Sequence, residues 1–424
     1  MYLNRVEKVE HSNKSENRAS VHDALNLILR DIHPVTTKET IATDDTSAIN
    51  RVVCDTIQAT CSLPRYDMSA MDGYALNYND INSCTSVFTV IGESAAGHPS
   101  QLEAKAREAV RIFTGAIVPQ GTDTVVIQED IECRDNKAQL IVPFEDIVKG
   151  QHIRRAGLDV SKGDDVIVPG SVLSSRHIAL LHSLGIDSAR VFTKPKIKVF
   201  ASGDEVKPLG AQLDYGDIFD ATSLPLQSLI EKWGGNVVHR ATIPDDREAL
   251  HTALFNDHKH HDLVVTIGGA SVGDHDHMHQ VLEEAGFQIS FWKINMRPGK
   301  PLLFATHNQR APVLALPGNP VSAMVCAWLF LQPAVRKLRG ECGDLSPRFI
   351  QGRLGVNLNQ NGSREDYMRC TISVHEDGYY EVLPFKVQDS SMIKTFADAH
   401  GLMRRPPHDP PSLVGEEVWF TFLD

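Results

Sequence analysis

The sequence lacks the features that mark several classes of protein. No stretch is long and apolar enough to span a bilayer, and residues 1–19 are polar and charged, without the apolar core of a secretory signal. The seven cysteines are scattered, and no pair has the close spacing of a zinc knuckle or a redox dithiol. We therefore expect a cytoplasmic protein with reduced thiols, no membrane partner and a disordered arm over residues 1–19.

Positive charge is also in short supply. The chain has 42 Lys and Arg against 54 Asp and Glu, a formal net charge of -12. A surface that binds nucleic acid needs clustered Lys and Arg, so we expect no nucleic-acid partner. A small phosphorylated molecule remains compatible with this charge, because a few local donors can hold a phosphate.

The 424 residues are too many for one ordinary core and predict two to four domains. A first helix is expected over residues 20–32, where Ser20 can cap the first turn, and a second near residues 37–41. Short strand-like runs predict a small β-rich domain, with strands at 87–90, 110–113, 124–128 and 139–142. A further helix is expected at residues 177–184, closed by Gly185.

From residue 196 onwards, strands and helices alternate. Strands are expected at 197–201, 236–241, 263–267 and 313–316, and helices at 223–233, 246–255, 278–285 and, as the longest amphipathic helix, 322–338. This rhythm predicts a doubly wound, mostly parallel α/β sheet. Beyond residue 340 we expect no helix, and short strands at 349–354, 367–374, 379–383 and 417–422 predict a β-barrel or a sandwich.

The strongest local motif follows the expected strand at 263–267. There Gly269 and Gly273 would let backbone amides approach a phosphate, Ser271 adds a hydroxyl donor, and Asp274 and Asp276 are hard oxygen ligands suited to a divalent cation. Ligands of open α/β sheets bind beyond the carboxyl ends of strands, where this motif lies. An ordinary strand-to-helix turn with capping aspartates is the alternative.

Two neighbouring loops predict an anion site. Pro317 and Pro320 flank a Gly-Asn pair between a strand and a helix, which would fix a rigid loop at the helix start. Lys293, Arg297 and Lys300 surround a Gly-Pro turn and would attract an oxyanion in this acidic protein. Taken singly, the first loop could be a helix stop and the second a solvated turn.

Carboxylates also follow two other expected strands. Asp204 and Glu205 come after the strand at 197–201, and Asp245 and Asp246 come after the strand at 236–241. Clustered carboxylates repel one another unless a cation joins them, so a metal such as Mg²⁺ is the economical interpretation. Capping of helix N-termini is the alternative use of these side chains.

Eight stretches of the chain together resemble one family. They are LPRYDMSAMDGYAL, RIFTGAIVPQGTDTVVIQED, HIRRAGLDVSKGD, VFASGDEV, GDIFDA, TIGGASVGDHD, FWKINMRPGKPL and LPGNPVSA. In this order they resemble the molybdopterin molybdenumtransferases, the family of MoeA proteins and the gephyrin E domain. Arg297 departs from that pattern, since many members carry Lys there, and a guanidinium is a rigid fork rather than a point charge.

The resemblance implies a multidomain α/β fold in which the C-terminal region is a β-barrel. The implied divisions are a disordered arm (1–19), an elongated linking domain in two segments (20–62 and 149–190), a small β-rich domain (63–148), an α/β molybdopterin-binding domain (191–340) and the barrel domain (341–424). It also implies a homodimer, with a cleft between the α/β domain of one subunit and the β-rich domain of the other.

The family's reaction takes adenylylated molybdopterin and molybdate as substrates, uses Mg²⁺ or another divalent cation, releases AMP and leaves molybdenum on the dithiolene. Carried over by motif, Glu205, Asp245 and Asp274 would hold the metal. The catalytic group would comprise Asp72, Thr114, Asp159, Glu205, Asp245 and Asp276, with Asp72 and Thr114 supplied by the partner subunit. The substrates would be bound by Gly269, Ser271, Gly273, Lys293, Arg297, Lys300, Pro317, Pro320 and Ser322, and Ser390 and Ser391 match loosely at the same cleft.

Three questions stay open at this level. The attacking group is either molybdate or water. The α/β domain alone would also suit the preceding enzyme, a molybdopterin adenylyltransferase, but the β-rich domain and the C-terminal extension favour the later step, so we expect that adenylyltransferase as a separate partner. A dimeric scaffold of the gephyrin E type is the alternative from another functional class.

Overall fold

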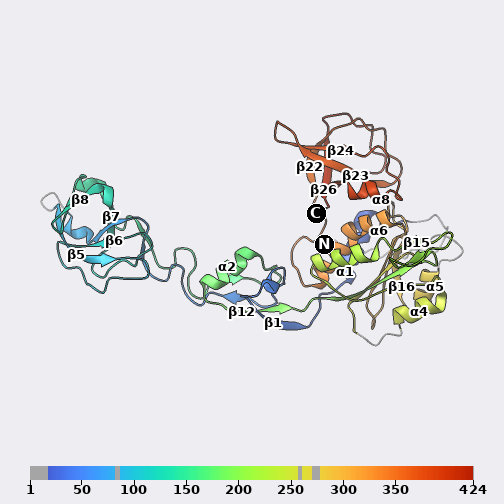
Figure 1. Ribbon diagram of the computed structural model, residues 1–424, viewed down its shortest axis with the longest axis horizontal. Helices are drawn as coiled ribbons and strands as arrows, with labels where there is room; N and C mark the ends of the chain where they lie inside the picture. The colour runs from blue at the N-terminus through green and yellow to red at the C-terminus, as the bar shows by residue number, and fades with distance from the viewer. Residues whose placement is uncertain (1–17, 82–85, 256–259, 270–276, 424) are drawn as a thin grey trace, which may run out of the picture. The chain divides into compact units, whose positions relative to one another are not determined.

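The computed structural model describes residues 18–81, 86–255, 260–269 and 277–423. The chain forms two compact units, one of Thr40–Val191 and one that joins Phe192–Asp424 to the described residues before Thr40 (Figure 1). Within the described part, no helix is both long and apolar enough to cross a membrane.

The unit Thr40–Val191 contains a six-stranded sheet in the order β7-β4-β6-β5-β9-β8. Its strands are β4 (Gly73–Leu76), β5 (Val87–Ser94), β6 (Glu108–Ile112), β7 (Thr124–Ile127), β8 (Ile131–Arg134) and β9 (Lys137–Leu140). Buried Tyr74, Phe88 and Val126 are part of the core beneath the sheet. The strand expected at 139–142 begins two residues earlier, and the other three predicted strands are confirmed.

The remainder of this unit is built from short pieces. Strand pairs β3–β10 and β2–β11 are made of β2 (Ile57–Gln58), β3 (Met68–Ser69), β10 (Ile153–Arg154) and β11 (Asp165–Ile167), and short 3₁₀ turns lie at Thr46–Ala48, Tyr78–Asp80, Gln128–Asp130 and Phe144–Asp146. Helix α2 (Ser175–Ser183) confirms the predicted helix and begins with a capping box between Ser174 and His177.

The helix expected near residues 37–41 is wrong. These residues form strand β1 (Lys38–Ala42), which pairs with β12 (Ser188–Phe192). Thr37, Thr40 and Ile41 are β-branched and favour extended backbone. A run this short cannot hold a helix without tertiary support.

The second unit contains the predicted doubly wound sheet, in the order β16-β13-β17-β21-β20-β18. The strands are β13 (Lys196–Ser202), β16 (Asn236–Ile243), β17 (Leu263–Ile267), β18 (Gln288–Trp292), β20 (Leu303–Thr306) and β21 (Val313–Leu316). The first four strands in the sheet are parallel to one another, and β20 runs antiparallel to both of its neighbours, β21 and β18. The mostly parallel α/β sheet is confirmed.

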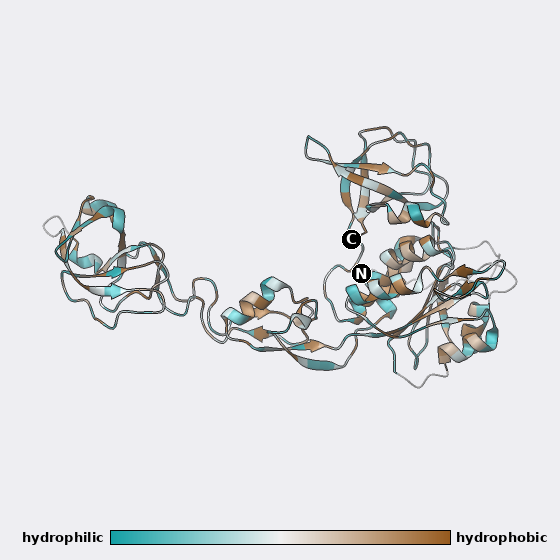
Figure 2. Cartoon of the chain, in the orientation of Figure 1, coloured by the Kyte–Doolittle hydropathy of each residue, from teal (hydrophilic) through white to brown (hydrophobic). Residues whose placement is uncertain are grey.

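Helices cover both faces of this sheet. One core contains residues of α1 (Val21–Asp31) and α3 (Ser223–Lys232), and the other contains residues of α4 (Arg247–Phe255) and α5 (His277–Glu284). Ser20 caps α1 as predicted by accepting from the Asp23 N–H, and the buried residues of α1 recur at helical spacing, so this helix has a hydrophobic and a hydrophilic side (Figure 2).

The long helix expected at 322–338 is present, but it is interrupted. It consists of α6 (Pro320–Cys326), a π-helical turn η5 (Ala327–Leu331) and α7 (Gln332–Leu338), and most of its side chains are buried. Pro333 has no N–H to donate to a preceding turn, and the wider turn before it lets Gln332 N–H donate to the Ala327 carbonyl instead. Burial between the sheet and its neighbours explains why polar residues are sparse around it.

The C-terminal region closes into a barrel, which decides between the barrel and the sandwich. The ring runs β23-β24-β22-β26-β25 and returns to β23. Its strands are β22 (Ile350–Leu354), β23 (Glu365–Val374), β24 (Tyr380–Pro384), β25 (Gly401–Arg405) and β26 (Glu417–Phe422). The expectation of no helix here is wrong, because α8 (Ile393–Ala397) precedes β25; its five residues are too few to show a helical period.

Candidate active site

The carboxyl ends of the parallel strands open onto one cavity of about 1030 Å³. Ser202 and Glu205 follow β13, Asp245 follows β16, and Gly268 and Gly269 follow β17. The Pro317–Pro320 loop follows β21 and lines the same cavity, as do Arg297 and Lys300 from the connection between β18 and β20. The cavity is where ligands of open α/β sheets bind.

Backbone packs against backbone in the wall of the cavity. Gly268 has φ +87°, and a Cβ there would lie 2.6 Å from the Ser202 carbonyl oxygen. A Cβ on Gly318 would lie 3.3 Å from the Gly268 Cα. The loops after β13, β17 and β21 are therefore in direct contact, and only glycine permits this approach at Gly268.

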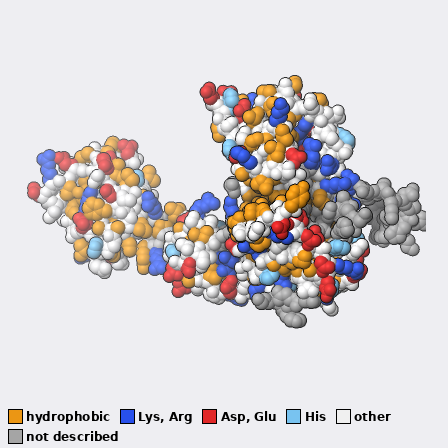
Figure 3. Space-filling model, turned by 45° about the vertical axis from the view of Figure 1, so that its right-hand side comes forward, with side chains coloured by type: hydrophobic (Ala, Val, Ile, Leu, Met, Phe, Trp, Pro, Cys, Tyr) orange, Lys and Arg blue, Asp and Glu red, His pale blue; other side chains and the backbone are white. Residues whose placement is uncertain are grey.

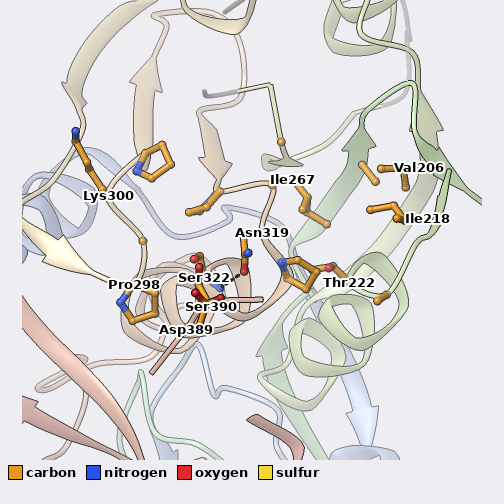
Figure 4. Close-up of a pocket in the computed structure, with 18 of the residues that line it drawn as sticks. Val206, Ile218, Thr222, Ile267, Pro298, Lys300, Asn319, Ser322, Asp389 and Ser390 are labelled. Atoms are coloured by element: carbon orange, nitrogen blue, oxygen red, sulfur yellow. Dashed lines mark hydrogen bonds between the residues drawn. The ribbon is translucent and has the colours of Figure 1, made fainter. Parts of the chain in front are cut away.

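The start of α6 faces the cavity. Asn319 caps the helix through its side-chain oxygen, which lies 3.5 Å from the Ser322 N, and Pro320 occupies the first turn. Ser322 itself is buried and lines the cavity (Figure 4). Because a helix N-terminus carries partial positive charge, this wall suits an anion.

The predicted carboxylates have different roles: some line the cavity, and one caps a helix. Asp245 lines the cavity and accepts a hydrogen bond from the Ser202 hydroxyl, while its own N–H donates to Asp204 at 3.1 Å. Asp246 caps α4 by accepting from the N–H groups of Glu248 at 3.0 Å and Ala249 at 2.8 Å. Capping therefore describes Asp246, and the predicted metal residues Glu205 and Asp245 share the cavity.

Asp220 is a cavity residue to which the sequence analysis assigned no role. It accepts hydrogen bonds from the N–H groups of Thr222 at 3.0 Å and Ser223 at 2.9 Å, and from the Ser223 hydroxyl, at the start of α3. Burial acts to raise the pKa of this carboxyl, but the hydrogen bonds from Ser223 and Thr222 outweigh it, so the pKa lies below its ordinary value. An Asp shortly before an apolar helical run was the available signal.

The three predicted cations do not share one environment. Arg297 and Lys300 line the cavity, whereas Lys293 does not: its Nζ lies 4.0 Å from the centroid of the Trp292 ring. Arg297 is ion-paired with Asp366 of the barrel.

The barrel supplies a further wall that the sequence analysis did not predict, apart from a loose match at Ser390. Its lining residues are Arg364, Met368, Lys386, Val387, Gln388, Asp389 and Ser390. Lys and Arg side chains are spread over the barrel surface in Figure 3, and Figure 4 shows Asp389 and Ser390 with α/β residues around the same cavity. Buried Arg369 holds this loop, with Nε 3.2 Å from Gln388 Oε1 and Nη1 2.8 Å from the Asp389 carbonyl oxygen. Ser391 donates to the Asp389 carboxylate through its N–H and hydroxyl.

The other predicted site residues belong to the unit Thr40–Val191. Asp72 and Thr114 lie together, since one Asp72 oxygen accepts from the Thr114 N–H at 2.7 Å and from its hydroxyl at 2.8 Å. These two bonds lower the pKa of Asp72. Asp159 lies elsewhere in this unit, where its N–H donates to the Leu63 carbonyl at 3.0 Å.

Four predicted residues, Ser271, Gly273, Asp274 and Asp276, lie outside the described residues. In the part of the chain that is described, no group of three His, Cys, Asp or Glu side chains is arranged to hold a metal ion.

Three protein-family models match successive parts of the chain. The MoeA N-terminal region (domains I and II) matches residues 19–185, a probable molybdopterin binding domain matches residues 198–337, and the MoeA C-terminal region (domain IV) matches residues 351–423.

Individual proteins match over most of their length. A molybdopterin molybdenumtransferase from Haemophilus influenzae is 36% identical over 354 residues, covering 83% of this chain and 86% of that protein. One from a Nostoc species is 31% identical over 369 residues, covering 85% and 84%. The crystal structure of a molybdopterin biosynthesis MoeA protein from Pyrococcus horikoshii matches with a TM-score of 0.81 and 25% identity, covering 96% of this chain and 100% of that one. These matches span both compact units.

Proposed function

We propose that this chain, which belongs to the MoeA family of molybdopterin molybdenumtransferases, inserts molybdenum into molybdopterin in cofactor biosynthesis. Molybdate is the molybdenum-carrying substrate, and the pterin substrate is the adenylylated form. Cleavage of its phosphoanhydride releases AMP and leaves molybdenum on the dithiolene.

The observation that carries this proposal is the distribution of charge in the 1030 Å³ cavity. Among the described residues, its charged lining residues are four acids, Glu205, Asp220, Asp245 and Asp389, and four bases, Arg297, Lys300, Arg364 and Lys386. The described part of the lining thus holds as many cations as carboxylates, in a chain whose net charge is -12, and this local share of cations favours an anionic substrate.

The donor set fits a divalent cation such as Mg²⁺. Mg²⁺ is commonly bound by one or two carboxylates together with substrate phosphates, and Glu205 and Asp245 both line the cavity. These two residues would hold the ion, with Asp274 as the third ligand that the family pattern implies. When bound, the cation supplies neutralisation of phosphate charge.

The chain's own groups act by binding and orientation. The backbone N–H of Gly269 and the start of α6 would donate hydrogen bonds to phosphate oxygens, while Arg297 and Lys300 attract the molybdate oxyanion. This is catalysis by positioning and electrostatics, in which no protein nucleophile is needed and the attacking oxygen belongs to molybdate or to water.

Two partners belong to the same proposal. A second copy of the chain would supply the Asp72–Thr114 pair to the cleft, and a separate molybdopterin adenylyltransferase would supply the adenylylated substrate. The short bonds that hold Asp72 and Thr114 together support a preformed pair.

The test is a turnover assay on the full chain with adenylylated molybdopterin, molybdate and Mg²⁺. AMP release is followed, and mature cofactor is detected by activation of an apo-molybdoenzyme. We expect AMP release that depends on molybdate and is lost in Asp245→Ala, and that persists in the neighbouring control Asp246→Ala, which removes only a helix cap. AMP release that does not depend on molybdate, or an equal loss of AMP release in both variants, would contradict the proposal and favour a scaffold role.

A further inference from the structure

An ion pair joins the barrel to the cationic side of the cavity. Strand β19 (Met296–Arg297) pairs in parallel with the start of β23, with Met296 opposite Glu365 and Arg297 opposite Asp366. In this register the Arg297 guanidinium donates to the Asp366 carboxylate. The pairing of the two strands places the backbones of Arg297 and Asp366 opposite each other, so their side chains can form the ion pair.

The two partners differ sharply in burial. The Asp366 side chain is 5% exposed and does not line the cavity, whereas the Arg297 side chain is 50% exposed and does. The pair therefore runs from the interior of the barrel to the cavity wall. The guanidinium nitrogen Nη2 is held by the Asp366 carboxylate, and the Arg297 side chain lines the cavity.

Arginine suits this arrangement because of its shape. A guanidinium carries five N–H donors in a rigid planar fork, so it can donate to a carboxylate along one edge and to an oxyanion along another. An unrestrained arginine loses rotamer freedom when it binds a ligand, and a fixed one has lost that freedom already. A lysine ammonium at position 297 would have to divide three donors on one atom between both partners.

The surroundings of Asp366 argue against a purely stabilising role. Burial raises the pKa of Asp366, and the three cations that face it, Arg297, Arg364 and Arg405, oppose this shift without cancelling it. Arg405 has a carboxylate partner of its own in Asp409. A buried carboxylate with a raised pKa is a cost to the fold at neutral pH, which points to a role outside stability.

We propose that Asp366 is a positioning residue for the transferase reaction: its carboxylate holds the Arg297 guanidinium so that the remaining N–H donors face the cavity and receive the molybdate oxyanion. This inference rests on the proposed function. Asp366 touches neither substrate, and its effect passes entirely through Arg297.

The test is a double-mutant cycle on the full chain. Asp366→Asn keeps the shape of the side chain and removes its charge, and Arg297→Lys keeps the charge at the cavity and removes the fork. We expect each to raise KM for molybdate on the order of tenfold and to leave kcat within about twofold, as for the loss of one charge-assisted hydrogen bond. The double variant should add no more than about twofold, because the second change removes an interaction already lost.

Two controls separate positioning from damage to the barrel. Asp409→Asn breaks the Arg405 pair, which lies in the same barrel but does not line the cavity, and it should leave KM for molybdate unchanged. Asp366→Glu restores a carboxylate and should recover part of the lost affinity. Additive effects in the cycle, or an unchanged KM in Asp366→Asn, would overturn the proposal.

Equilibrium dialysis of molybdate against the same full-length variants gives a readout that needs no turnover. If molybdate affinity falls in Asp366→Asn and is unchanged in Asp409→Asn, the positioning role of Asp366 is supported. This holds even if the wild-type chain releases no AMP, because the absence of AMP release would count only against the proposed function. Wild-type affinity in Asp366→Asn, or no molybdate binding by the wild-type chain, would refute the positioning role.

Discussion

A substitution at Gly299 tests how the cationic loop is seated on α6. Gly299 has φ +115°, and a Cβ there would lie 2.5 Å from the Cys326 Sγ, with the Met296 sulfur at 3.3 Å. Cys326 is fully buried in α6. Gly299→Ala therefore introduces two separate costs, an unfavourable backbone conformation and an overlap with a buried sulfur.

The magnitudes follow from these two terms. A left-handed conformation costs a non-glycine residue about 1–2 kcal/mol, and overpacking a well-filled core costs about 1–3 kcal/mol, so Gly299→Ala should lose about 2–5 kcal/mol of unfolding free energy. Gly378→Ala is the matched control, because Gly378 has φ +85° and nothing within 4 Å of its Cβ. It should lose only the conformational term, about 1–2 kcal/mol.

The assay is hydrogen exchange in increasing urea, which reads the opening free energy of segment 296–302 and of α6. In a Cys326→Ala background the sulfur is gone, and the added cost of Gly299→Ala should fall to that of Gly378→Ala. The close contact between Gly299 and the Cys326 sulfur would be refuted if Gly299→Ala lowers the opening free energy equally with and without that sulfur, or by no more than Gly378→Ala does.

Three further outcomes are expected from the titratable groups. Asp366→Asn should raise the thermal midpoint of unfolding at neutral pH. A carboxyl whose pKa is raised in the folded state contributes stability below its unfolded pKa and loses that stability as pH rises through the folded pKa, so the advantage of the variant over the wild type should shrink in acid. A lower midpoint for the variant at neutral pH would refute this. Asp220→Ala should lower the unfolding free energy by about 1 kcal/mol, because it removes the hydrogen bonds to the start of α3. Urea unfolding across pH should show this difference above the unfolded pKa of the carboxyl, and should show it disappear as pH falls through the lowered folded pKa. Thr114→Val should raise the pKa of Asp72 towards its ordinary value in a carboxyl NMR titration, since it removes one of the two bonds that lower that pKa.

Elements with a local cause were predictable from the sequence. The strands β17 and β21 have the predicted bounds, and α1 begins at the predicted Ser20 cap. Each depends on side-chain periodicity or on a cap within a few residues, which is information that a short window of sequence contains. The mostly parallel sheet followed from the alternation of these elements.

Elements whose cause lies far away in the chain were not predictable. Arg297 and Asp366 meet only because β19 pairs with β23, and no local pattern marks Arg364 or Lys386 as cavity residues. The misreading of residues 37–41 has the same origin, since their partner strand β12 lies about 150 residues later in the chain.

The order of the strands places two carboxylates of the cavity apart from two of its cations. Strands β16 and β13, which are followed by Asp245 and Glu205, lie at one edge of the sheet, and the connection between β18 and β20, which contains Arg297 and Lys300, lies at the other. The glycine and proline loops after β17 and β21 lie between them. In the proposed reaction, the phosphoanhydride and its cation would meet Asp245 and Glu205, and the oxyanion would meet Arg297 and Lys300. This separation needs the crossover that places β13 between β16 and β17, so it is a property of the fold that neither charged motif contains when taken alone.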